Sequence, residues 1–322
     1  MLKRILLGLV AVIVIALLVS FTYVQFTWDK VYDIPYPSLT SSTDSAVIAL
    51  GEYYVNGPAH CSTCHTENLS GGETFNMGPM GEVTTANLTP DSETGIGRYE
   101  DKEIFRMMRH AVKPNGRASI ALMMPFWNMA DDDMIAVVSY LRSLEPVKKE
   151  IPPPNWSMMG KVLRSFSSTF EPVYEPSPMK KAPPMEATVE RGKYLANFVA
   201  NCVACHTKRD DMTFQAIAPE FSGGLLMETD AEYNIANGLD PNLMFETPNL
   251  TPHPQSKLAQ FKTMEDWITR FRAGRVFATS PMSWEWFSRM TDEDLGAIYV
   301  YLNSLDPVEN NIVSTAFIKT EE

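Results

Sequence analysis

The sequence predicts a mainly α protein in which an N-terminal transmembrane helix precedes two tandem copies of one domain. Three observations predict this fold: an uncharged apolar run from Ile5 to Val24, a series of short motifs that occurs twice in the same order, and helical spacing of apolar residues at the ends of each copy. The expected segments are an anchor, a linker, a first domain, a proline-rich connector, a second domain and a tail, at residues 1–28, 29–44, 45–149, 150–187, 188–310 and 311–322.

The apolar run is about 20 residues long, which is enough to cross a bilayer as a helix. Lys3 and Arg4 precede it and Asp29 follows it, so the positive-inside rule places the N-terminus in the cytoplasm and everything after Trp28 outside. A cleavable signal peptide is the alternative. The run is longer than a usual signal core and lacks a small-x-small cleavage site, so we expect an uncleaved single-pass anchor.

The two copies share their motifs in order, with small insertions between them, as duplicated domains do. The paired motifs are Gly51-Glu-Tyr53 with Gly192-Lys-Tyr194, Ser70-Gly-Gly72 with Ser222-Gly-Gly224, Asn87-Leu-Thr-Pro90 with Asn249-Leu-Thr-Pro252, Gly116-Arg117 with Gly274-Arg275, and Tyr140-Leu141 with Tyr301-Leu302. Each copy is expected to be helical at its ends, and its middle, rich in Gly, Pro, Thr and Asn, to form loops.

The pentapeptide Cys-x-x-Cys-His also occurs twice, and the two copies use every cysteine of the chain. It comprises Cys61, Cys64 and His65 in the first copy, and Cys202, Cys205 and His206 in the second. Cysteines at i and i+3 with histidine at i+4 lie on one face of a helical turn. Two thiols can then bond to the vinyl groups of one porphyrin while the imidazole binds its iron. Because this pentapeptide is the attachment signature of haem c, we expect two covalent haems c.

Three other interpretations of the cysteines fit the sequence less well. A zinc ribbon needs paired knuckles about 15–20 residues apart, whereas Cys64 and Cys202 are separated by more than a hundred residues. A thioredoxin-like motif does not call for a histidine after the second cysteine. Disulfides within each motif would leave both histidines unexplained.

A haem iron bound by histidine takes a second axial ligand or keeps an open site. Met124 lies seven residues after Arg117, and Met282 lies seven residues after Arg275. Each has a neighbouring proline, which favours an extended loop able to point a side chain at the iron. Methionine opposite histidine raises the reduction potential and suits electron transfer. Met124 and Met282 are therefore the expected distal ligands.

The rival ligands are less suitable. Met129 and Met290 are also matched between the copies, but they occupy hydrophobic-staple positions before the last helices and are expected to pack there. The remaining histidines, His60, His110 and His253, have no counterparts in the other copy. Ligation by two histidines is therefore not expected in both domains.

Arg117 and Arg275 are candidates for contacts with the haem propionates, which arginine makes well. The alternative is an ordinary surface arginine near a helix C-terminus. The acidic clusters Asp131-Asp-Asp133 and Asp292-Glu-Asp294 are interpreted as charges at helix N-termini rather than as metal sites, and Thr291 is the expected N-cap of the last helix.

Composition constrains the partners and the connector. The chain has 322 residues and a formal net charge of −12, which makes nucleic acid a poor partner and a basic patch on a redox protein a suitable one. Residues 145–187 contain nine prolines. They predict a semi-rigid extended connector, interrupted by a short helix near Met158 to Ser167.

With these motifs, the chain resembles the membrane-anchored dihaem class I cytochromes c, and it is similar to the cytochrome c subunits of bacterial membrane dehydrogenases for alcohols and gluconate. The resemblance covers about residues 45–310. The family usually carries three haem motifs where this sequence has two, and Met282-Ser283 stands where Met-Pro is usual. The motifs that carry the resemblance are Cys61-x-x-Cys64-His65-Thr66, Ser70-Gly-Gly72, Asn87-Leu-Thr-Pro-Asp91, Thr94-Gly-Ile-Gly97 and Met124-Pro125-Phe126, with their second-copy counterparts.

The resemblance implies two tandem class I cytochrome c domains at the bacterial inner membrane, facing the periplasm. The expected function is single-electron transfer between a quinol-oxidising or dehydrogenase complex and a cytochrome or terminal oxidase, without catalysis by this chain. A dihaem subunit of a haem-copper oxidase is the alternative with the same chemistry. A dihaem peroxidase is the enzyme alternative, and it would need one accessible iron.

Overall fold

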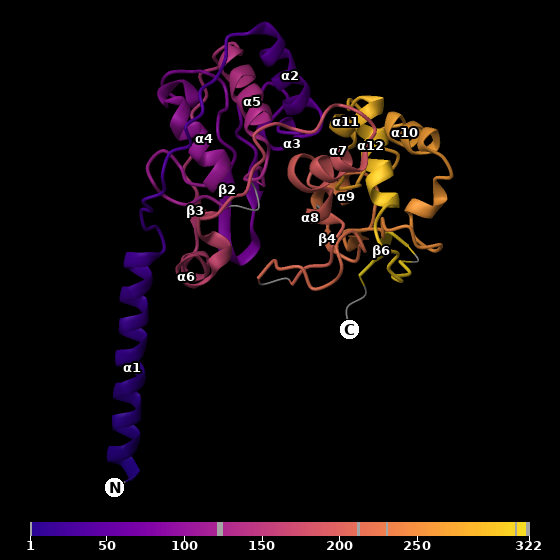
Figure 1. The fold of residues 1–322 in the computed structure, drawn as a ribbon. Helices are drawn as coiled ribbons and strands as arrows, with labels where there is room; N and C mark the ends of the chain where they lie inside the picture. The colour runs from indigo at the N-terminus through magenta and orange to yellow at the C-terminus, as the bar shows by residue number, and fades with distance from the viewer. Residues whose placement is uncertain (1, 121–124, 211–212, 230, 313, 320–322) are drawn as a thin grey trace.

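The computed structural model describes residues 2–120, 125–210, 213–229, 231–312 and 314–319. Figure 1 shows a long N-terminal helix that projects from two helical units lying side by side. We call residues 45–149 the first half and residues 188–310 the second half. Each half holds one of the two cysteine motifs.

The projecting helix is α1 (Leu2–Thr27). Within the described residues it is the one helix long and apolar enough to cross a membrane, and its apolar window is not buried against the rest of the protein. The segment after it lies along the first half. The backbone N–H of Tyr32 donates to the carbonyl of Gly116 (2.8 Å), and the backbone N–H and hydroxyl of Ser41 donate to Asp101 (2.7 and 2.6 Å).

The first half is organised by the packing of its first helix, α2 (Ser45–Asn56), against its last, α5 (Asp131–Ser143). The two helices cross at Gly51. A Cβ atom there would lie 1.9 Å from the carbonyl oxygen of Ala136, so a larger residue would force the helices apart. Glycine weakens a helix, and it is used here because the backbones must approach closely.

The second half repeats this crossing with α7 (Val189–Tyr194) and α12 (Asp292–Asn303). A Cβ atom at Gly192 would lie 1.9 Å from the carbonyl oxygen of Ala297. The expected cap of the last helix is confirmed, because the Thr291 hydroxyl accepts the N–H of Asp294 (3.2 Å). The helices between the terminal ones are α3 (Ser62–His65) and α4 (Asp101–His110) in the first half, and α8 (Cys202–Cys205), α9 (Ala231–Ala236), α10 (Met264–Arg272) and α11 (Trp284–Phe287) in the second.

The middle segments, expected to be loops, also contain short strands. Each of two antiparallel sheets has three strands in the orders β1-β2-β3 and β4-β5-β6. The third strand of each sheet comes from outside its half, from the connector and from the expected tail. The strands are β1 (Thr74–Asn76), β2 (Gly81–Thr84), β3 (Asn155–Trp156), β4 (Leu226–Glu228), β5 (Leu243–Glu246) and β6 (Ala316–Ile318).

The connector contains the short helix expected near Met158 to Ser167, as α6 (Met158–Phe166). Ser157 caps it, since its hydroxyl accepts the N–H of Gly160 (3.1 Å). The later part of the connector runs along the first half. There the N–H of Asp131 donates to the carbonyl of Met179 (2.9 Å) and the N–H of Ala182 donates to the carboxylate of Asp132 (3.0 Å).

The two halves contact each other through a reciprocal pair of tyrosine–aspartate hydrogen bonds. Tyr53 of the first half donates to Asp294 of the second (2.7 Å), and its oxygen accepts the N–H of Thr291 (3.2 Å). Tyr194 of the second half donates to Asp133 of the first (2.6 Å). Its oxygen accepts the N–H of Ala130 (3.1 Å). The same positions of the repeat therefore bond in both directions.

One further pair breaks this symmetry. Arg191 and Asp294 form a fully buried ion pair with two contacts of 2.8 Å, and Arg191 also donates to the hydroxyl of Tyr54 (3.2 Å). Leu50 occupies the position of Arg191 in the first half. Asp294 thus has a neutralising arginine of its own half, whereas Asp133 is held chiefly by tyrosine hydroxyls.

Asp133 makes stability depend on pH. Burial raises the pKa of its carboxyl from 3.8 to about 6. The folded protein therefore binds this proton more tightly than the unfolded chain. The contribution of the group to stability is fully present below about pH 4 and is lost as the pH rises through 6, a total of about 3 kcal/mol.

Replacing Asp133 by Asn should remove this dependence. Between pH 4 and pH 7, the unfolding free energy of Asp133→Asn should rise relative to that of the parent by about 2 kcal/mol, measured by denaturant titration at each pH. Asp132→Asn, with the same charge change on the same helical turn, is the control. Parallel pH profiles for Asp133→Asn and the parent would show that this carboxyl does not control the interface.

Candidate haem sites

The first motif lies on the short helix α3, directly after the turn that ends α2. Cys61, Cys64 and His65 are brought together within this single turn. The Nδ1 atom of His65 lies 2.8 Å from the carbonyl oxygen of Ala86. Because a carbonyl only accepts, Nδ1 carries the proton, and Nε2 is left with a lone pair suited to a metal. Burial lowers the pKa of His65, which also favours the neutral ring.

The second motif has the same arrangement around α8. Cys202 and Cys205 bound the helix, and the Nδ1 atom of His206 lies 3.0 Å from the carbonyl oxygen of Pro248. Burial lowers the pKa of His206 as well. Ala86 and Pro248 are the residues before the two Asn-Leu-Thr-Pro motifs. Each Asn-Leu-Thr-Pro motif thus directly follows the residue whose carbonyl orients the candidate axial histidine.

The asparagine of that motif fixes the orienting carbonyl. Asn87 accepts the N–H and hydroxyl of Thr89 (3.0 and 2.7 Å) and donates to the carbonyl of Val147 (2.7 Å). Asn249 accepts from Thr251 (2.9 and 2.8 Å) and donates to the carbonyl of Val308 (2.8 Å). These valines belong to the Pro-Val pairs that close both repeats, so the bonds tie each histidine-orienting loop to the end of its half.

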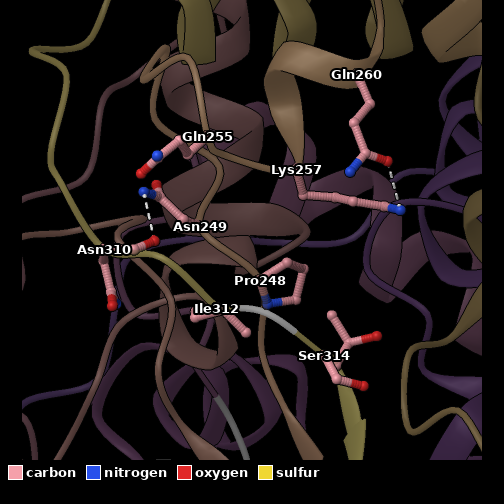
Figure 2. Close-up of a pocket in the computed structure, with 9 residues that line it drawn as sticks. Pro248, Asn249, Gln255, Lys257, Gln260, Asn310, Ile312 and Ser314 are labelled. Carbon is pink, nitrogen blue, oxygen red and sulfur yellow. Dashed lines mark hydrogen bonds between the residues drawn. The ribbon is translucent and has the colours of Figure 1, made fainter.

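Figure 2 shows a pocket in the second half that Pro248 and Asn249 line together with polar side chains. Lys257 and Gln260 bond to each other there, through Nζ and Oε1 at 2.8 Å. Polar walls do not suit a porphyrin. This pocket is thus separate from the candidate haem sites.

The Ser-Gly-Gly motif supports the other end of the histidine segment. The N–H groups of Gly71 and Gly223 donate to the carbonyls of His65 (2.9 Å) and His206 (2.8 Å). Both glycines have positive φ, and a Cβ atom on Gly71 would lie 2.3 Å from the carbonyl oxygen of Ala86. This sharp turn brings the chain back to the carbonyl that holds His65, so a side chain cannot be accommodated.

The four cysteines are free thiols in the structure. Burial raises the pKa of Cys61 and of Cys202 to about 12. Cysteines that exchange disulfides have a lowered pKa and an exposed thiolate. These thiols therefore do not fit a thioredoxin-like redox motif. Each pair lies beside a histidine whose ring is oriented by a backbone carbonyl, and this arrangement fits covalent attachment.

In the second half, His206 and Met282 line one apolar cavity together with Cys202. The structure thus brings together an expected attachment cysteine, the expected proximal ligand and the expected distal ligand. The walls are apolar, as a porphyrin plane requires. The remaining lining residues are Ala200, Leu250, Trp267, Phe271, Phe287, Met290, Ile298 and Leu302. The residues present here fit a haem.

Met124, the expected distal ligand in the first half, lies outside the described residues. The rival methionines Met129 and Met290 are 0% and 1% exposed and belong to the hydrophobic core. His60 packs with its ring edge against Phe287 of the other half, at a centroid distance of 4.9 Å. The Nδ1 atom of His110 lies 2.7 Å from the carbonyl oxygen of Val173.

The two arginines expected near the propionates have protein partners. Arg117 pairs with Asp29 just beyond α1, at 2.6 Å. Arg275 makes a bidentate pair with Glu285 (2.6 and 2.7 Å) and donates to the carbonyls of Ser280 and Met282. Arg275 therefore braces the loop that carries Met282. A propionate contact by either arginine stays a prediction.

Another pair of arginines was missed by the sequence analysis. Arg109 at the end of α4 donates to the carbonyls of Trp127 and Met129 (2.6 and 2.7 Å) and to Asp131 (2.6 Å). Arg272 at the end of α10 bonds the three matching positions. These are the carbonyls of Ser288 and Met290 and the carboxylate of Asp292. Each arginine fixes the segment that follows the candidate distal methionine of its half.

Comparison with known proteins identifies the first of these units. Residues 53–145 match the cytochrome c family. They are a cytochrome c domain. A cytochrome c domain implies haem c, and the Cys61–His65 motif lies within the matched residues.

The whole chain is also similar to larger cytochrome subunits. The cytochrome c subunit of alcohol dehydrogenase (quinone) from Gluconacetobacter polyoxogenes is 30% identical over 287 residues, covering 84% of this chain and 58% of that protein. The gluconate 2-dehydrogenase cytochrome c subunit of Pantoea cypripedii is 28% identical, covering 81% and 60%. A diheme cytochrome c-type protein of Cereibacter sphaeroides is 22% identical, covering 77% and 83%. The resemblance to dehydrogenase cytochrome subunits is confirmed, and the chain spans a little over half the length of the first two.

We call Arg109 with Asp131, and Arg272 with Asp292, the two arginine clamps. They differ in burial, which gives a matched test. Arg109 and Asp131 are 3% and 10% exposed in their side chains, whereas Arg272 and Asp292 are 38% and 65% exposed. Asp131→Ala leaves a buried guanidinium without its carboxylate and should cost about 3–5 kcal/mol of unfolding free energy. Asp292→Ala should cost about 1 kcal/mol or less. Both are measured by denaturant unfolding, and equal losses would contradict the clamp as described.

Proposed function

We propose that the protein is a membrane-anchored dihaem c-type cytochrome that transfers single electrons on the periplasmic side of a bacterial inner membrane. Its donor would be a quinol-oxidising or dehydrogenase complex, and its acceptor a cytochrome or terminal oxidase. The observation that carries the proposal is the identical set of contacts around both histidines. Each Nδ1 faces a carbonyl oxygen, and each following asparagine makes the same three hydrogen bonds.

This repetition supports two tandem haem domains. The first half is the cytochrome c domain, and the second reproduces its helix crossing, its histidine tie, its Ser-Gly-Gly turn and its arginine clamp. The second half, which repeats these contacts, also repeats the attachment motif, from Cys202 to His206. The similarity to a diheme cytochrome supports two haems as well.

When bound, a haem supplies a one-electron couple whose potential is set by its axial ligands and surroundings. The chain's own residues would control that couple. In the second half, His206 would hold the iron through Nε2, with its ring oriented by the carbonyl of Pro248, and Met282 would be its second ligand. The apolar walls exclude water and so limit the change in solvation on electron transfer.

Partner choice follows from charge and anchoring. The net charge of −12 disfavours anionic lipid surfaces and favours encounter with basic surfaces on a redox protein. Helix α1 would keep both haem domains at the membrane, where quinol-oxidising and dehydrogenase complexes are found. The dehydrogenase subunits among the relatives support a dehydrogenase as the donor.

The number of haems is tested by intact mass. Native protein should exceed the polypeptide mass by two haem groups that acid-acetone does not extract, because thioether bonds hold them. Replacing Cys61 and Cys64 by Ala should remove one group and leave the other, and replacing Cys202 and Cys205 should do the same for the second. A single haem in the parent protein would refute the dihaem proposal.

The distal ligands are tested by spectroscopy and redox titration. Oxidised protein should show a weak methionine-to-iron charge-transfer band that accounts for both haems. Met124→Ala and Met282→Ala should each lose about half of it and lower the potential of one haem, because methionine ligation raises that potential. Met129→Leu and Met290→Leu are the matched controls and should keep the band.

The same variants separate an electron carrier from an enzyme. Met124→Ala and Met282→Ala should gain carbon monoxide binding at the opened iron, whereas the parent protein should not bind it. Carbon monoxide binding by the parent, together with turnover of peroxide, would support a dihaem peroxidase instead.

A further inference from the structure

The helix α6 carries an apolar face that the rest of the protein leaves uncovered. Met158, Met159, Val162 and Phe166 are 49%, 54%, 39% and 63% exposed. Their spacing places them on one side of the helix. Single exposed apolar residues are ordinary, but four on one face of a nine-residue helix form a patch of the kind that marks an interaction site.

This face lies beside the end of the N-terminal helix. The ring of Phe166 stacks on that of Tyr23, with centroids 5.2 Å apart. The Nε atom of Arg164 donates to the carbonyl of Trp28 (3.1 Å). Figure 1 shows α6 level with the upper end of α1, where the chain enters the first half. A bilayer crossed by α1 would therefore have its outer boundary at the height of α6.

The polar residues at this level suit a lipid headgroup region. Lys161 lies over the ring of Trp28 (4.9 Å), and Lys30 lies over the ring of Tyr32 (4.7 Å) and pairs with Glu171 (3.6 Å). Tryptophan and tyrosine are enriched at membrane–water boundaries, and basic residues there interact with lipid phosphates. These lysines contrast with the acidic net charge of the whole chain.

We propose that α6 lies in the headgroup region of the bilayer that α1 crosses, with Met159, Val162 and Phe166 facing the acyl chains. This inference rests on the proposed role of α1 as an anchor. Lipid is the expected occupant because the patch is continuous with the end of a membrane-spanning helix, around which lipid is already present. The protein then has two membrane attachments, which fix the orientation of the first half as well as its distance from the membrane.

The test uses the full-length protein with its haems, reconstituted in nanodiscs of phosphatidylcholine and phosphatidylglycerol. A nitroxide-bearing amino acid is placed singly at Met159, at Val12 inside α1, and at Val189, an exposed apolar residue on α7. Electron paramagnetic resonance then measures the accessibility of each label to oxygen, which partitions into lipid, and to a water-soluble nickel chelate. Labels at 159 and 12 should favour oxygen, and the label at 189 should favour nickel.

The three labels separate the inference from the anchor on which it rests. A label at 12 in lipid with a label at 159 in water would overturn the docking of α6 and leave the anchor intact. A label at 159 in lipid with a label at 12 in water would support the docking of α6 and overturn the anchor. A label at 159 shielded from both reagents would show a protein occupant, such as a second copy of this chain, and would overturn the lipid assignment.

A charge placed in the patch gives a second measurement. Val162→Asp should lower the oxygen accessibility of the label at 159 and raise its nickel accessibility, because a carboxylate is disfavoured among acyl chains. Val189→Asp, the same change away from the membrane, should leave that label unchanged. Equal effects of the two substitutions would overturn the proposal.

Discussion

The close crossing of the first and last helices organises each half, and the site is built on it. Gly51 and Gly192 let these helices meet with no space for a methyl group between the glycine and the opposing carbonyl. Each cysteine motif begins ten residues after its glycine. The crossing therefore sets where the histidine stands relative to the last helix. The Pro-Val pair that follows this helix in the chain ties the histidine-orienting loop. One backbone contact thus determines both sides of the candidate haem site.

The sequence could predict the parts whose chemistry is local. The Cys-x-x-Cys-His turns, the cap at Thr291 and the short connector helix each depend on a few adjacent residues, so they can be recognised in the sequence. The strands were not predicted, because β3 and β6 are two and three residues long and pair with segments far away in the chain. A period of two cannot be recognised over so few residues.

The arginine clamps and the interface show a different limit. Arg109 and Arg272 stand at slightly different offsets in the two repeats, so aligning the motifs did not pair them. The sequence predicts Asp133 and Asp294 as charges at helix N-termini, and both lie in the first turn of a helix. Their second role is not visible in the sequence. Each also accepts a hydrogen bond from a tyrosine of the other half. The spacing of apolar residues within one repeat shows which residues it buries in its own core, but not which residues contact the other repeat.

The reciprocal tyrosine–aspartate bonds have the form of a two-fold homodimer interface, in which residue i meets residue j and j meets i. Here both partners belong to one polypeptide, so their association is intramolecular and does not weaken on dilution. A homodimer would also have to carry every substitution twice. In a single chain, Arg191 can neutralise one buried aspartate while Leu50 leaves the other without an arginine. Joining both halves in one chain thus lets two candidate haem sites acquire different electrostatic surroundings, and a directed electron transfer between them would require such a difference.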